Sequence, residues 1–120
     1  MAITRYFRFK RKSDRCRLKG WAQIDVPYLG LAVPGTLVDI SLHGAGVRVV
    51  STRLNALLGQ PAILKMKVPG WPRIVHAYVI IERHVAKQKG RLLGLRFVSI
   101  DDAALAQVEE YVRQHQRLAA

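Results

Sequence analysis

The segment PAILKMKV at residues 61–68 shows an alternation of apolar and polar residues that is typical of a β-strand. Its apolar residues Leu64 and Met66 alternate with Lys65 and Lys67. Such alternation is typical of a strand with one face buried and the other face in water. Five further apolar and β-branched stretches are bounded by turns that mostly contain glycine or proline, at 21–31, 35–41, 44–50, 73–86 and 90–100. The sequence therefore predicts six strands.

The hydrophobic period changes after the last of these stretches. Leu105, Val108 and Val112 recur at i, i+3 and i+7, which is the apolar stripe of an amphipathic helix. We expect this helix at about residues 101–118. Six strands joined by short turns favour a closed antiparallel barrel, because closure leaves no exposed edge strand. The predicted fold class is all-β: a six-stranded antiparallel β-barrel with a C-terminal α-helix packed alongside.

Composition agrees with one folded domain and excludes several classes of protein. The chain has 120 residues, half of them apolar, which is enough for a single core. No apolar run approaches the roughly 18 residues of a membrane-spanning helix, and no signal peptide is present, so we expect a cytoplasmic protein. The single cysteine, Cys16, argues against a disulfide scaffold and against a zinc module.

Positive charge is concentrated at the N-terminal end of the chain. The formal net charge is +12, and residues 1–19 hold eight basic side chains against one acid, Asp14. We expect residues 1–19 to form a basic arm that is mobile without ligand, because it is too charged to join the core. Residues 20–120 would then form the barrel and the helix. The charge points to an anionic partner such as a nucleic acid, a nucleotide or a lipid head group.

No arrangement of residues predicts catalysis or a resident metal. Asp39, Ser41 and His43 lie close together, but alternate positions of one strand do not give the nested geometry of a nucleophile and its base. A G-x-S-x-G elbow is also missing. The four histidines show no ligand spacing, and there is no glycine-rich phosphate loop. We therefore expect a protein that is not an enzyme.

Two short motifs remain, and the first of them is R-x-x-x-R at Arg11 and Arg15. Taken alone it has little meaning, because thirteen arginines in this chain should produce about one such spacing by chance. A second copy at Arg113 and Arg117 lies on the expected helix and is interpreted as part of its solvated last turn. The arginine spacing needs a second element before it predicts a site.

The second motif is D-x-S-x-x-G at Asp39, Ser41 and Gly44. We expect Asp39 and Ser41 to project on the same face of a strand, since they stand two apart. A carboxylate offers two acceptors that suit the N1–H and N2–H₂ donors of guanine, and an arginine fork suits O6, N7 or phosphate. Gly44 would let the ligand approach the backbone. Together the two motifs favour a ligand that carries both guanine and phosphate.

On these motifs the chain resembles a PilZ domain, the bacterial receptor module for cyclic di-GMP. The family's R-x-x-x-R is matched by RKSDR at 11–15 and its [D/N]-x-S-x-x-G by DISLHG at 39–44. A late G-x-x-F strand is matched at Gly94 and Phe97. The resemblance covers nearly the whole chain, and it implies a split barrel of six strands with a terminal helix.

The resemblance also implies roles for five residues. Arg11 and Arg15 would grip guanine and phosphate, and Asp39 and Ser41 would hold a guanine edge. Gly44 would leave room for the base. The domain would act without catalysis, as a receptor or adaptor that changes its surface for a downstream protein partner.

The residue before the first arginine, Lys10, is associated in the family with ligand stoichiometry. A basic residue there could counter the added phosphates of an intercalated pair, which favours two molecules of cyclic di-GMP per domain. No cofactor is expected besides this ligand.

Two alternatives stay open. A general nucleic-acid-binding barrel would use the basic arm and aromatic residues such as Tyr6, Phe9, Trp21 and Trp71, with affinity that falls steeply with salt. A ligand-independent PilZ-like interaction domain would keep the fold without binding a nucleotide.

Overall fold

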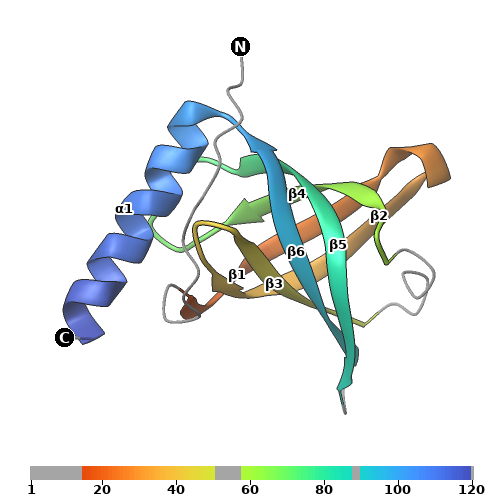
Figure 1. The fold of residues 1–120 in the computed structure, drawn as a ribbon, viewed down its shortest axis with the longest axis horizontal. Helices are drawn as coiled ribbons and strands as arrows, with labels where there is room; N and C mark the ends of the chain where they lie inside the picture. Colours follow the sequence, from red (N-terminus) through yellow and green to blue (C-terminus); the bar gives the residue numbers. More distant parts are fainter. Residues whose placement is uncertain (1–14, 51–57, 88–89, 120) are drawn as a thin grey trace.

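The six predicted strands form a closed antiparallel barrel (Figure 1). The structure is a computed structural model that describes residues 15–50, 58–87 and 90–119. The strands follow one another around the barrel in the order β1-β2-β3-β6-β5-β4, and β4 pairs back with β1. Their bounds are β1 (Cys16–Val26), β2 (Leu31–Ile40), β3 (Gly44–Val49), β4 (Pro61–Lys67), β5 (Val75–Lys87) and β6 (Gly90–Ile100). A short 3-10 turn, η2 (Pro27–Leu29), joins β1 to β2. The predicted fold class is confirmed.

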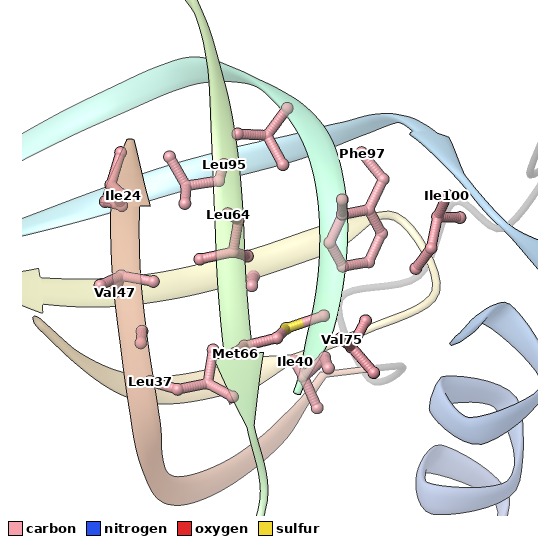
Figure 2. Packing of buried hydrophobic residues seen from close by; sticks show 14 of the residues in the cluster. Ile24, Leu37, Ile40, Val47, Leu64, Met66, Val75, Leu95, Phe97 and Ile100 are labelled. Atoms are coloured by element: carbon pink, nitrogen blue, oxygen red, sulfur yellow. The ribbon is translucent and has the colours of Figure 1, made fainter. Parts of the chain in front are cut away.

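The barrel interior is filled by the apolar side chains that alternate along each strand. In β4, Leu64 and Met66 are fully buried, as the pattern of this segment predicts. Figure 2 shows them beside Ile24, Leu37 and Val47 from three other strands. Since burial of one such aliphatic side chain contributes about 1.5–3 kcal/mol, this interior is the main source of stability. The outer face of the barrel carries charged side chains such as Lys67 and also exposed apolar ones such as Tyr78 and Val98.

The helix α1 (Asp102–Ala119) lies alongside the barrel (Figure 1). The carboxylate of Asp101 caps it by accepting a hydrogen bond of 2.7 Å from the backbone N–H of Ala104. The predicted stripe of Leu105, Val108 and Val112 is buried against the core. No helix among the described residues combines the length and the apolar character needed to cross a bilayer.

The helix also contacts the turn after β4 and the start of β1. Trp71 is buried and meets Tyr111 of α1 edge to face, with ring centroids 6.1 Å apart. Cys16 is buried with its Sγ 4.0 Å from the carbonyl oxygen of Val112. The first residue of β1 therefore packs directly against the helix.

The barrel begins four residues earlier than the expected boundary between arm and barrel. Residues 16–19, which the sequence assigned to the arm, belong to β1. The reason is that Cys16 is buried under α1, and Leu18 packs against the core although its neighbours are charged. The rest of the predicted arm, residues 1–14, lies outside the described residues.

Candidate functional site

The pairing of β1 with β2 brings the end of the arm to the D-x-S-x-x-G motif. Cys16 pairs with Ile40 and Arg17 pairs with Asp39. Arg15, which is exposed and directly precedes Cys16, therefore lies at the same end of the strand pair as Ser41. Of the predicted site residues, Arg15, Asp39, Ser41 and Gly44 are gathered here. Lys10 and Arg11 lie outside the described residues.

Ser41 forms the turn between β2 and β3 instead of extending the strand. Its hydroxyl accepts hydrogen bonds from the backbone N–H groups of His43, at 3.1 Å, and Gly44, at 3.3 Å. It also lies 3.4 Å from the Gly44 carbonyl oxygen, to which it donates. The expectation that Asp39 and Ser41 share one strand face is wrong, because β2 ends at Ile40. The hydroxyl therefore accepts hydrogen bonds from the backbone N–H groups of a tight turn.

These contacts engage the Ser41 hydroxyl with the backbone of the turn. The hydroxyl of Ser41 is surrounded by backbone groups of the turn and is buried. Elsewhere in the described part of the chain, no three histidine, cysteine or carboxylate side chains come close enough to hold a metal ion.

Gly44 is required by the barrel itself. A Cβ atom at this position would overlap the carbonyl oxygen of Leu95 in β6. The contact continues at His43, whose carbonyl oxygen accepts a 2.7 Å hydrogen bond from the backbone N–H of Phe97. The absence of a side chain at Gly44 thus lets the turn lie against β6.

A β-bulge turns Asp39 to the outer face of the barrel. Leu37 pairs with Val47 and Asp39 with Gly46, so that Val38 is the extra residue. Strict alternation from the buried Leu37 would have placed Asp39 in the core. Instead its carboxylate lies over Gly46, where an added Cβ would be 2.7 Å from Oδ2.

A second bulge stands on the other side of the same surface. Ile81 pairs with Leu95 and Arg83 pairs with Gly94, which makes Glu82 the extra residue of β5. Arg83 consequently faces outward, with its side chain over Gly94. Gly46 and Gly94 are themselves partners across β3 and β6. Sequence reasoning missed Gly46 and Arg83, and gave Gly94 no role beyond family resemblance. The Gly44-x-Gly46 spacing on a short strand was the one available signal.

Cations surround Asp39 on this outer face. Arg17 pairs with it across β1 and β2, Arg48 lies two residues beyond Gly46 on β3, and both side chains are exposed. The carboxylate of Glu82 accepts a hydrogen bond of 2.7 Å from Nε of Arg96, with which it forms an ion pair. The surface therefore favours an anionic ligand that also carries hydrogen-bond donors for one carboxylate.

A separate hollow of about 610 Å³ opens near the start of β1. The lining side chains include Lys19, Trp21, Lys67 and Trp71. Trp21 is 43% exposed, whereas Trp71 is only 8% exposed because it packs against α1. Of the two tryptophans considered as stacking platforms, only Trp21 offers much ring surface.

Comparisons with known proteins agree with this architecture. The family model described as PilZ domain matches residues 9–114. The fold is similar to the inhibitor of motility MotI/DgrA of Bacillus subtilis, with a TM-score of 0.76 and 17% identity over 93% of this chain and 53% of that one. It is also similar to the PilZ domain of YcgR from Escherichia coli, solved with c-di-GMP, with a TM-score of 0.69 and 17% identity over 92% of this chain and 95% of that one.

A third similar structure is MrkH of K. pneumonia in its apo state, with a TM-score of 0.68 and 12% identity over 93% of this chain and 54% of that one. The chain spans about half the length of MotI/DgrA and of MrkH. No curated protein matches the sequence.

Proposed function

The chain belongs to the PilZ domain family, and from this premise we propose that it is a non-catalytic receptor for cyclic di-GMP. The single observation that carries the proposal is the position of Asp39, turned outward by a bulge over Gly46 and adjacent to the end of the arm. The PilZ domain of YcgR, which shares the fold, was solved with c-di-GMP.

Asp39 accepts the N1–H and N2–H₂ donors of one guanine in this proposal. Arg11 and Arg15 grip guanine acceptors and phosphate oxygens, because a guanidinium fork fits both. Ser41 positions the turn through its backbone hydrogen bonds, and Gly44 holds that turn against β6. Lys10 adds charge beside the first arginine, which favours two ligand molecules.

Ligand binding changes the surface at the junction of arm and helix. The arm closes over the ligand from the residues that precede Cys16, and Cys16 packs against Val112 of α1. The closed arm and the adjacent helix then form the surface that a downstream protein partner recognises. Since the messenger is intracellular, we expect the receptor in the cytoplasm.

Calorimetric titration of single variants with cyclic di-GMP tests this function. Charge-assisted hydrogen bonds contribute about 1.5–3 kcal/mol each, so Arg15→Ala and Asp39→Ala should each weaken binding by roughly tenfold or more. The matched control is Arg113→Ala, from the second R-x-x-x-R copy, whose guanidinium pairs with Glu110 at 2.8 Å on the exposed side of α1. The control should bind normally. Undiminished affinity in both Arg11→Ala and Arg15→Ala would refute the assignment.

Single-stranded nucleic acid is the second candidate ligand. The exposed ring of Trp21 between Lys19 and Lys67 favours it, because a base can stack on the ring while the lysines contact phosphates. Trp21→Ala separates the candidates. The substitution should weaken binding of a short RNA if this candidate is right, and should leave the affinity for cyclic di-GMP unchanged if the receptor proposal is right.

A further inference from the structure

Four neighbouring strands place a pair of glycines between two outward-facing side chains. β2, β3, β6 and β5 lie side by side in the barrel (Figure 1). Gly46 and Gly94 occupy the two central strands as register partners. Their flanking residues, such as Val47 and Leu93, point into the core, so both glycines face outward. This glycine strip is two strands wide, and Gly46 is buried beneath the side chain of Asp39.

The two outer strands provide the walls of this strip. From β2, the carboxylate oxygens of Asp39 lie 2.7 and 2.9 Å from the position of a Cβ on Gly46. From β5, Cβ and Nε of Arg83 lie 3.1 and 3.6 Å from the position of a Cβ on Gly94. Three strand spacings separate the backbones of the walls, about 14 Å. The two side chains lean inward from these backbones over the glycine pair, so a base that contacts both of them would lie against this part of the surface.

The chemistry of the walls matches the two edges of guanine. A carboxylate is a pair of acceptors, and the Watson–Crick edge of guanine carries N1–H and N2–H₂ donors. A guanidinium is a fork of donors, and the adjoining edge of guanine carries the acceptors O6 and N7. Adenine fails on both sides, because its N1 acceptor would face Asp39 and its N6 amino group would face Arg83. The strip is complementary to guanine and to neither adenine nor a bare phosphate.

Both walls depend on bulges that have no other evident use. The extra residues Val38 and Glu82 turn Asp39 and Arg83 outward, one on each side of the glycine pair. Bulges that re-aim a side chain are common beside binding sites. Within the described residues Arg83 forms no ion pair, whereas its neighbour Glu82 is engaged by Arg96. A guanidinium held over bare backbone is available to a ligand.

We propose that Arg83 is a further ligand-binding residue, which reads the O6 and N7 edge of the guanine whose other edge is held by Asp39. The inference rests on the proposed function and deepens it. It assigns the recognition of this guanine to two side chains on the barrel, and it leaves the arm arginines to grip the phosphates and the acceptors of the second guanine. Arg83 is a specificity-determining residue in this scheme.

The experiment measures binding of two ligands by calorimetry: cyclic di-GMP and its analogue with 7-deazaguanine bases, which lack the N7 acceptor. Wild-type protein should bind the analogue severalfold more weakly than cyclic di-GMP. Arg83→Ala should weaken cyclic di-GMP binding by roughly tenfold or more, since a bidentate contact to guanine contributes about that much discrimination. The same variant should no longer distinguish the two ligands. Arg113→Ala, whose guanidinium pairs with Glu110 on the exposed side of α1, is the control and should keep the wild-type ratio.

Two results would overturn the inference. Arg83→Ala with wild-type affinity would show that the side chain does not contact the ligand. Arg83→Ala that binds weakly but still discriminates against the 7-deaza analogue would place Arg83 on phosphate and not on the base. Circular dichroism confirms that each variant is folded. A wild-type chain that does not bind cyclic di-GMP refutes the proposed function itself, a result distinct from the two above.

Discussion

The barrel has a regular side and a bulged side, and their carboxylates are used differently. On the regular side β4 pairs with β1 from Trp21–Lys67 to Asp25–Ile63 without any shift of register. There Asp25 is held by Nζ of Lys65 at 2.8 Å and accepts a hydrogen bond of the same length from the Gln23 side chain. The hydrogen bond from Lys65 lowers the pKa of the Asp25 carboxyl below its usual 3.8. The Asp25 carboxylate therefore has hydrogen-bonding partners within the sheet.

On the bulged side, Asp39 and Arg83 face outward over glycines. Asp39 lies over Gly46 and Arg83 lies over Gly94. Each bulge gives up regular pairing in order to aim a side chain. The difference teaches that regular pairing serves stability, and that the side chains to which we assign ligand binding lie where the register shifts.

Gly44→Ala should break the fold, and it is the largest effect that we expect. The new Cβ would overlap backbone atoms of Leu95, which cannot move without separating β3 from β6. We predict a loss of about 3 kcal/mol or more in the free energy of unfolding, seen as a drop of roughly 10 °C or more in Tm. Thermal denaturation followed by circular dichroism measures it. A wild-type Tm would mean that the glycine serves only the ligand.

Gly46→Ala, two residues further along β3, should affect binding and not the fold. Here the new Cβ would meet the end of the Asp39 side chain, which can rotate away. We expect the stability to change by less than about 1 kcal/mol. Cyclic di-GMP binding should weaken by tenfold or more, because a charged acceptor is displaced. The comparison between the two glycines would fail if Gly46→Ala lowered Tm as much as Gly44→Ala does.

Asp25 should contribute a small, pH-dependent stability. Its pKa is lowered in the folded state, so the contribution is present above pH 3.8 and disappears as the pH falls through the lowered pKa. The pair with Lys65 is partly exposed, at 17% and 32% of the side chains, and should contribute less than about 1 kcal/mol. Urea unfolding of wild type and Asp25→Asn should differ at pH 7 and converge once the pH has fallen below the lowered pKa of Asp25. A difference that persists in acid would assign the effect to packing.

The sequence predicted the strands and the helix because alternation governs most of this barrel. The buried positions of α1 and β4 could be predicted from local sequence periodicity alone. Alternation fails at the bulges: counted from the buried Val79 and Ile81, Arg83 would point into the core. The motif spacing identified Asp39, but its outward position comes from the extra residue Val38, which no local pattern reveals.

Ser41 and Gly44, which the motif predicts as ligand residues, also have structural roles in the fold. Ser41 lies beyond the end of β2 and serves the turn, and Gly44 serves the approach of β6. Contacts between distant strands decide both roles, so they could not be derived from neighbours in the sequence. The roles of Lys10 and Arg11 stay predictions, because both residues lie outside the described part of the chain.

The most direct test of the central claim is one titration of the wild-type chain, at moderate salt, with cyclic di-GMP, cyclic di-AMP, GTP and a short RNA. A guanine site built by Asp39 and completed by the arm arginines predicts saturable binding of cyclic di-GMP and much weaker binding of the other three. Binding of the RNA without binding of cyclic di-GMP would contradict the account and make the chain a general nucleic-acid-binding barrel.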